Sequence, residues 1–285
     1  MLLLCLGLIK KIVFADSLSI FVDQVFSHIP MSSSEAWIGA SLYAFQIYFD
    51  FSGYSDLALG SAYLLGFRLP INFRSPYLST TPSDFWKRWH ISLSEWIKDY
   101  IYIPLGGSKK GFFQSSIVLI FTMTVAGIWH GGSINFLIWG ILWGFYIVLG
   151  RVIKINKKFS LLIWPFHIAI VFMLWVLFRA ENISQAFSYW KIMLGLRQNF
   201  SNITDNLNES LINSPSNPDL LMYFFLLIIS MFIFHFIEAL LTGKKFIYFL
   251  KRIRGLYLNS LLLTLIFLLV MIPDFNTNPF IYFRF

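Results

Sequence analysis

The sequence predicts an all-α, polytopic transmembrane helical bundle with an interfacial amphipathic helix. Hydrophobic residues make up 57% of the 285 residues and charged residues only 13%, and the mean hydropathy is +0.68. A soluble domain carries about 25% charged residues, so this composition is that of an integral membrane protein. The apolar residues also gather into stretches of about 20, the length that an α-helix needs to cross the hydrocarbon core of a bilayer.

Five uninterrupted apolar stretches predict spanning helices. They comprise residues 112–129, 134–150, 159–178, 220–241 and 256–272. A sixth stretch, residues 36–66, is long enough to span but contains Asp50, Gly53, Asp56 and Gly60. Charged residues at membrane depth must face protein or a water-filled cavity, and glycine weakens a helix. We therefore expect this stretch to form a broken helix whose polar residues face away from lipid.

Positive charge is distributed unevenly between these stretches, and the net charge is +8. Lys and Arg number seven in residues 67–111, none in 131–133, four in 151–158, three in 179–219 and five in 242–255. This alternation follows the positive-inside rule, so 67–111, 151–158 and 242–255 are predicted to be cytoplasmic. Membrane topology thereby accounts for the basic residues. The lipid bilayer is a predicted partner, and nucleic acid is not.

Residues 81–105 differ from the spanning stretches because polar and aromatic residues alternate at helical spacing. Thr81 as N-cap, Pro82 at the first helical position and Asp84 form a helix start signal. The aromatic and apolar arc comprises Trp86, Trp89, Leu93, Trp96, Ile97 and Tyr100. Ile91 is the one residue that does not fit this pattern. We expect a single helix along the cytoplasmic interface, with its aromatic side chains in the acyl boundary and its basic residues near the headgroups.

His130 stands in the run GIWHGGSIN, between two of the predicted spanning helices. These helices are roughly 27 and 25 Å long at 1.5 Å per residue, and three residues connect them, so the turn cannot rise far into water. The charge pattern places His130 toward the leaflet opposite the cytoplasm. An ionisable side chain there favours a functional site, and bonding of a backbone carbonyl is the structural alternative. Burial favours the neutral imidazole, which can accept a proton at pH 7.

His90 projects at the border between the two faces of the amphipathic segment. It is either an interfacial side chain anchored by a hydrogen bond or a residue of an active-site tunnel entered from the cytoplasm. The run GGSKKG at 106–111 could contact phosphates of a soluble donor or serve only as a topology anchor. His28, His167 and His235 have no comparable context. No spacing resembles a metal-ligand pattern, so we expect no metal and no tightly bound cofactor.

Several motifs, in order along the chain, resemble those of the membrane-bound O-acyltransferase family and in particular its bacterial alginate O-acetyltransferase branch. They are DFSGYSDLALGSAYLLGFRLPINFRSPYLSTTPSDFWKRWHISLSEWIKDYIYIPLGG, GIWHG, LFRAEN and PFIYFRF. The resemblance implies a transmembrane helical bundle with a tunnel or funnel that carries an acyl group toward a hydroxyl acceptor. It also implies that residues 1–285 are a single membrane-embedded domain lacking the family's N-terminal helices, either a fragment or a truncated form.

The resemblance also implies roles for two histidines. His130 matches the histidine of the WHG motif, which implies a catalytic role, and His90 matches the histidine of WxRWHxSLSxW, in the same active-site region. The implied donor is an acyl thioester, such as acetyl-CoA or an acyl carrier, on the cytoplasmic side. The implied acceptor is an envelope polysaccharide, alginate-like or peptidoglycan, with an extracytoplasmic acyltransferase as partner. The implied location is the bacterial inner membrane, which the chain crosses several times.

The chemistry of acyl transfer suits these residues. A base must take the proton of the sugar hydroxyl as the tetrahedral intermediate forms, and a neutral buried imidazole does this near pH 7. We therefore expect His130 to be the general base. The donor for the oxyanion stays open among His90, the Trp129 indole and backbone amides. Two other functions also stay open: D-alanyl transfer to teichoic acid, and a non-catalytic membrane conduit or inactive fragment.

Overall fold

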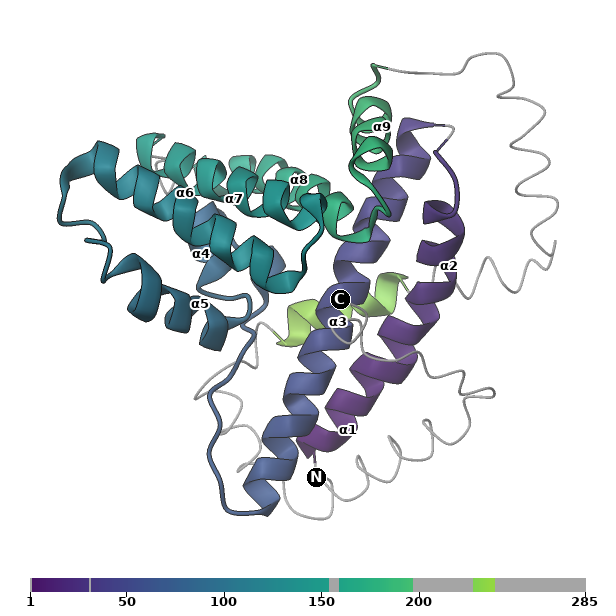
Figure 1. Ribbon diagram of the computed structural model, residues 1–285. Coiled ribbons are helices and arrows are strands. Elements are labelled where there is room, and N and C mark those ends of the chain that lie inside the picture. The colour runs from purple at the N-terminus through teal and green to yellow at the C-terminus, as the bar shows by residue number, and fades with distance from the viewer. Residues whose placement is uncertain (1, 31, 154–158, 197–227, 239–285) are drawn as a thin grey trace.

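The computed structural model describes residues 2–30, 32–153, 159–196 and 228–238 of the chain, and every regular element within these residues is a helix. The helices form two groups, a column built from the N-terminal part of the chain and a set of three long helices that crosses it steeply (Figure 1). The predicted all-α class is confirmed.

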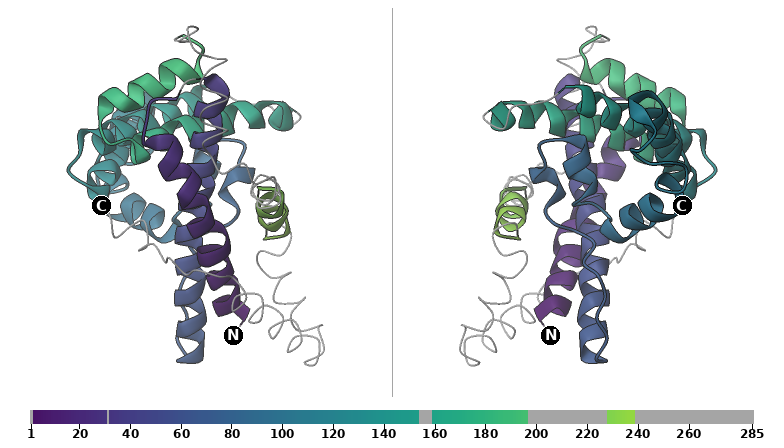
Figure 2. Two further views of the ribbon diagram at one scale, coloured as in Figure 1. Left: turned by 90° about the vertical axis from the view of Figure 1, so that its right-hand side faces the viewer. Right: turned by 90° about the vertical axis from the view of Figure 1, so that its left-hand side faces the viewer.

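The column consists of helices that pack side by side. Its elements are α1 (Leu2–Leu8), the π-helix η1 (Ile9–Asp16), α2 (Ser17–Phe26) and α3 (Ser33–Leu64). The first three follow one another along α3, and both views of Figure 2 show them as one column with α3. The chain reverses between α2 and α3, where the side chain of Ser32 caps α3 by accepting a hydrogen bond from the backbone N–H of Glu35 at 3.1 Å.

Glycines bring the backbones of the column into contact. A Cβ at Gly7 would lie 2.8 Å from the carbonyl oxygen of Gly53, and a Cβ at Gly53 would lie 2.9 Å from that of Gly7. Small residues allow this close approach between membrane helices. Because α3 is continuous, the predicted break within 36–66 is wrong, and Gly53 serves packing. Asp50 and Asp56 form ion pairs within the protein, which confirms that their side chains face away from lipid.

The crossing group comprises α6 (Gly111–His130), α7 (Ile134–Val152) and α8 (Ser160–Arg179). All three are long and apolar enough to cross a membrane. They begin and end within two residues of the predicted spans 112–129, 134–150 and 159–178, so these three predictions are confirmed. A shorter apolar helix, Ile228–Glu238, lies inside the predicted span 220–241. The rest of that span, and all of 256–272, lie outside the described residues.

Glycines also set the contact between α6 and α7. A Cβ at Gly127 would lie 2.2 Å from the carbonyl oxygen of Phe136, and a Cβ at Gly140 would lie 2.3 Å from that of Met123. No side chain fits at either position without moving the backbone. The two helices therefore pack closely over the half that leads to the end of α6.

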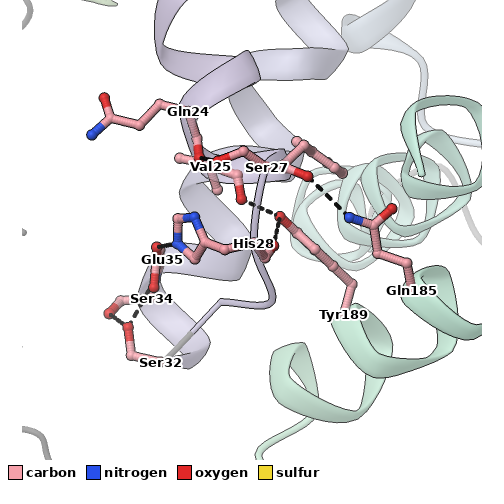
Figure 3. Close-up of polar contacts among 10 residues, drawn as sticks. Gln24, Val25, Ser27, His28, Ser32, Ser34, Glu35, Gln185 and Tyr189 are labelled. Atoms are coloured by element: carbon pink, nitrogen blue, oxygen red, sulfur yellow. Dashed lines mark hydrogen bonds and ion pairs between the residues drawn. The ribbon is translucent and has the colours of Figure 1, made fainter. Parts of the chain in front are cut away.

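α9 (Ile183–Met193) links the crossing group to the column. Figure 3 shows Tyr189 and Gln185 of α9 reaching the end of α2. The Tyr189 hydroxyl donates to the carbonyl oxygen of Val25 at 2.5 Å, and the Gln185 amide donates to that of Phe26 at 2.9 Å. These bonds satisfy carbonyl groups that the last turn of a helix leaves open, so they hold α2 and the end of α8 in one unit.

The chain between the two groups forms four short helices. They are η2 (Pro76–Leu78), α4 (Pro82–Trp86), α5 (Ile91–Ile97) and the π-helix η3 (Lys98–Tyr102). The predicted start of α4 is confirmed, because Thr81 accepts a hydrogen bond from the backbone N–H of Asp84 at 3.1 Å. The prediction of one uninterrupted helix is wrong. The break falls at residues 87–90, and Ile91, which did not fit the helical pattern, begins the next helix.

The aromatic side chains of this segment do not share one face. Trp89 is 1% exposed and packs against Trp175 of α8, with ring centroids 4.8 Å apart. Trp96, by contrast, is 52% exposed. The break turns α4 and α5 in different directions, so Trp89 enters the protein core and Trp96 stays on the surface. Contacts with a distant helix therefore decide the environment of Trp89, which local periodicity cannot show.

Candidate active site

His130 is the last residue of α6, and only 6% of it is exposed. Gly131 follows, and a Cβ there would lie 2.8 Å from the ring of Phe136, so the glycine leaves room for that ring. The side-chain amide of Asn135, at the start of α7, donates to the carbonyl oxygen of Ala180, just after α8, at 2.8 Å. The ends of α6 and α8 and the start of α7 therefore meet around His130.

Aromatic rings surround the His130 imidazole, and we call them the aromatic enclosure. Its members are Trp129, Phe136, Trp139 and Phe178. Their ring centroids lie 4.9, 6.2, 5.4 and 4.9 Å from that of His130, in that order. Trp139 and Phe178 are buried, whereas Trp129 is 56% exposed. The enclosure is therefore closed on its inner side by Trp139 and Phe178 and reaches the molecular surface at Trp129.

His90 lies at the break between α4 and α5 and has a left-handed backbone conformation, with φ 42° and ψ 57°. A residue other than glycine in this region stores about 1–3 kcal/mol of strain, and such residues cluster at functional sites. Its ring stands nearly perpendicular to that of Phe51, with centroids 4.7 Å apart. Burial lowers the pKa of His90 to about 4, so the imidazole is neutral at pH 7.

α4 carries the chain along α7 toward the enclosure. Pro82 contacts Gly150 near the C-terminal end of α7, where a Cβ would lie 3.2 Å from the proline ring. Trp86 lies 5.8 Å from Trp139 and 5.2 Å from Trp143, measured between ring centroids. Gly150 and Trp139 are about 16 Å apart along α7 at 1.5 Å per residue. The segment thus advances along much of α7, and the break at its end brings His90 to the site.

The two histidines that the sequence singled out come together at Trp129. The His90 centroid lies 6.1 Å from that of Trp129, which in turn lies 4.9 Å from that of His130. The positions along the chain are 40 apart, and the sequence placed His90 in a cytoplasmic segment and His130 toward the other leaflet. The segment that contains α4 bridges this separation. Their catalytic roles remain predictions.

Two of the other three histidines, His167 and His28, have different surroundings. His167 in α8 is hydrogen-bonded to the Ser79 hydroxyl at 3.0 Å and to the Tyr146 hydroxyl at 2.7 Å, so it ties the segment before α4 to α7. His28 pairs with Glu35 at 2.7 Å on the surface (Figure 3). These contacts are structural, and both side chains lie away from the aromatic enclosure.

A second buried polar group joins the column to helix Ile228–Glu238, and we call it the ion cluster. It comprises Lys10, Lys11, Asp16, Asp50, Asp56 and Glu238. The Lys10 ammonium lies 2.7 Å from Asp56 and also pairs with Glu238, and the Lys11 ammonium lies 2.7 Å from Asp50. The sequence singled out the two aspartates of α3 but missed both lysines. Their spacing from the aspartates, about 40 positions, left no local signal.

The described side chains do not indicate a metal centre. Within the part of the chain that the structure describes, no three His, Cys, Asp or Glu side chains are grouped so that they could hold a metal ion.

Sequence reasoning also missed Trp139 and Phe178 as neighbours of His130. Phe178 belongs to the LFRAEN motif, and Trp139 lies on the helix that follows GIWHG, so motif proximity was the available signal.

The family model for MBOAT, the membrane-bound O-acyltransferase family, matches residues 1–182, which include both histidines and the whole aromatic enclosure. The chain belongs to the membrane-bound O-acyltransferase family. It is a multi-pass membrane protein, because this family is polytopic and three helices are long and apolar enough to span. The resemblance seen in the motifs is thereby confirmed.

Three curated relatives are named for activities on different acceptors. The probable alginate O-acetylase AlgI of Pseudomonas fluorescens is 43% identical over 183 residues, 63% of this chain and 37% of that protein. The peptidoglycan O-acetyltransferase of Helicobacter pylori is 40% identical over 200 residues, which are 67% of this chain and 38% of that protein. The teichoic acid D-alanyltransferase of Streptococcus thermophilus is 36% identical over 124 residues, which are 41% of this chain and 30% of that protein. The chain spans 30% to 38% of the length of these relatives.

Proposed function

We propose that this chain carries the catalytic site of an O-acyltransferase in the bacterial inner membrane, which moves an acetyl group from a thioester donor to hydroxyls of a cell-envelope polysaccharide. The observation that carries the proposal is the position of His130. The imidazole is buried at the end of a spanning helix, among uncharged aromatic rings, and both it and the His90 ring contact Trp129. A buried neutral imidazole at membrane depth is suited to take a proton from a hydroxyl.

The reaction proceeds through a tetrahedral intermediate. The acceptor oxygen attacks the thioester carbonyl carbon, a C–O bond forms, and the hydroxyl proton moves to His130. The carbonyl π electrons move to the carbonyl oxygen, which becomes an oxyanion. When the intermediate collapses, the C–S bond breaks and the thiolate takes the proton from His130. The products are the O-acyl ester and the thiol, so the imidazole returns to its starting state and no external acid or base is consumed.

The donor route follows from the segment that contains α4. Residues 67–111 carry seven basic residues, which favours a cytoplasmic position for the start of this segment. From there α4 leads along α7 to His90 and Trp129. A donor such as acetyl-CoA or an acyl carrier would enter on this side, and the acceptor, or an extracytoplasmic partner enzyme, would approach the exposed ring of Trp129.

D-alanyl transfer to teichoic acid is the second candidate, because a relative named for that activity matches 41% of the chain. The chemistry at His130 is the same, and only the acyl group and the acceptor differ. Mass spectrometry of the envelope polymers, with and without the gene, separates the two: acetyl esters indicate the first function and D-alanyl esters the second.

The test of the catalytic site is His130→Ala. If His130 is the general base, polymer acylation should fall by about 10² to 10⁴ fold at equal protein level. The measurement is the amount of ester released from envelope polysaccharide by mild alkali, normalised to the protein in the membrane fraction.

The matched control is His28→Ala, because His28 is exposed and pairs only at the surface. His167 is a poorer control, since its loss leaves the buried hydroxyls of Ser79 and Tyr146 without their partner. Acylation that persists in His130→Ala would favour a conduit or an inactive form. An equal fall in His28→Ala would mean that His130 has no special role.

A further inference from the structure

The indole N–H of Trp139 is a buried donor beside the proposed base. Trp139 is 0% exposed, and its Nε1 has no hydrogen-bond partner among the described residues. Its ring stands at 90° to the His130 imidazole, with centroids 5.4 Å apart. A buried indole N–H usually finds an acceptor, and leaving it without one costs about 1–3 kcal/mol. The Nε1 atoms of Trp86, Trp143 and Trp175 also lack a partner among the described residues. Trp139 is of interest because its ring contacts that of His130.

The aromatic enclosure reaches the surface at Trp129, and Trp139 lies on its buried side. The imidazole is 6% exposed, so a carbonyl that reaches it must enter the aromatic enclosure. The rings on the inner side are Trp139 and Phe178, whose centroids lie 4.8 Å apart. Of these two, only Trp139 can donate a hydrogen bond. A carbonyl oxygen placed next to His130 on this side therefore meets one donor, the indole N–H.

We propose that the Trp139 indole N–H donates a hydrogen bond to the carbonyl oxygen of the acyl group and stabilises the oxyanion of the tetrahedral intermediate. The inference rests on the proposed function. As the acceptor oxygen bonds to the carbonyl carbon and His130 takes its proton, the negative charge develops on the oxygen held by Trp139. The charge returns to the C=O bond when the C–S bond breaks. The indole keeps its proton throughout, so the step needs no further reactant.

Burial makes Trp139 a stronger donor for this purpose than Trp129. An oxyanion donor is most effective in a fixed position from which water is excluded, because the low dielectric strengthens the interaction. Trp129 is 56% exposed, so its ring is available to the acceptor, and Trp139 is enclosed. The two tryptophans that contact His130 therefore have different roles in this proposal: Trp139 binds the acyl carbonyl and Trp129 lines the approach of the acceptor.

The test replaces Trp139 with benzothienylalanine, which keeps the size of the bicyclic ring and removes the N–H. The matched control makes the same replacement at Trp143, which is also 0% exposed, has an Nε1 without a partner among the described residues, and lies one turn farther from His130 on α7. Membrane vesicles that contain the full chain are supplied with radiolabelled acetyl-CoA over a concentration series. Transfer to endogenous polymer gives kcat and KM.

We expect kcat to fall by about 10² fold for the Trp139 replacement, with KM for acetyl-CoA nearly unchanged, because an oxyanion donor acts mainly in the transition state. The Trp143 replacement should leave both parameters close to those of the unmodified protein. Equal effects at the two positions, or no effect at Trp139, would overturn the inference. The proposed function fails separately, if His130→Ala vesicles transfer acetyl at the normal rate or if unmodified vesicles transfer none.

Discussion

The ion cluster and the aromatic enclosure around His130 both hold polar side chains inside a membrane protein, and they do so in opposite ways. In the ion cluster each lysine ammonium contacts two carboxylates, so every charged group lies next to one of opposite sign. In the aromatic enclosure the imidazole of His130 is surrounded by uncharged rings. The first arrangement fixes helices relative to one another, whereas the second surrounds a titratable group with apolar rings, which suits the proposed role of His130 as a base.

This difference teaches which kind of change each centre tolerates. Removing one member of a buried ion pair is costly, because the other charge stays buried without a partner. An uncharged aromatic wall tolerates loss of a polar atom more easily than the addition of a charge. The ion cluster should therefore be sensitive to removal of charge, and the region of the enclosure should be sensitive to its introduction.

The largest expected effect is that of Trp89→Glu, next to the site. Trp89 is 1% exposed and packs on Trp175, so the variant loses a large buried ring and gains a buried carboxylate. The expected loss of stability is on the order of 5 kcal/mol or more, enough to prevent accumulation of folded protein. Protein in the membrane fraction and the Tm in detergent measure it.

Trp96→Glu is the matched control, because Trp96 lies on α5 and is 52% exposed. We expect a small effect. Equal damage from the two variants would mean that both rings face lipid on one uninterrupted aromatic face, as the sequence pattern alone predicts, and would remove the contrast between the two helices.

Lys10→Met should have the next largest effect and tests the ion cluster. Methionine replaces the apolar part of the lysine side chain but leaves Asp56 and Glu238 without their shared cation. Breaking a buried pair in this way costs about 3–5 kcal/mol. The expected result is a lower Tm, with any residual folded protein keeping its acylation activity per molecule.

The control for Lys10 is Lys98→Met, since Lys98 is exposed and lies 3.3 Å from Asp99 at the surface. Exposed pairs contribute about 0–1 kcal/mol. A Lys10→Met protein as stable as this control would indicate that the ion cluster is not a structural lock. Loss of activity without loss of stability would instead place Lys10 in the chemistry and blur the distinction between the two centres.

The smallest effect concerns the strained backbone at His90. Its φ of 42° suits glycine, so His90→Gly should be more stable than His90→Ala by about 1 kcal/mol. Both variants should lose acyl transfer if the imidazole is needed. Thermal unfolding in detergent and ester content of the polymer test the two parts. If His90→Ala is as stable as His90→Gly, the active protein does not have the left-handed backbone conformation at residue 90.

Local sequence was sufficient where local forces decide the structure. Hydropathy set the ends of α6, α7 and α8 to within two residues of the observed bounds, because each of these helices satisfies its own backbone and needs only apolar length. The start of α4 at Pro82 followed from the Thr81 cap for the same reason. The motifs also identified the family, because their order along the chain does not depend on the fold.

Tertiary contacts decided the rest. Asp50 and Gly53 suggested a broken helix, but α3 is continuous, because Lys11, 39 positions away, neutralises the aspartate and the glycine accepts the backbone of α1. Helical periodicity favoured one helix beyond Pro82, yet burial of Trp89 against α8 and the turn at His90 divide it. The sequence determined the membrane class, the spanning helices and the two histidines. Only packing between distant segments, which no local pattern records, brought His90 to Trp129, the residue that precedes His130 in the chain.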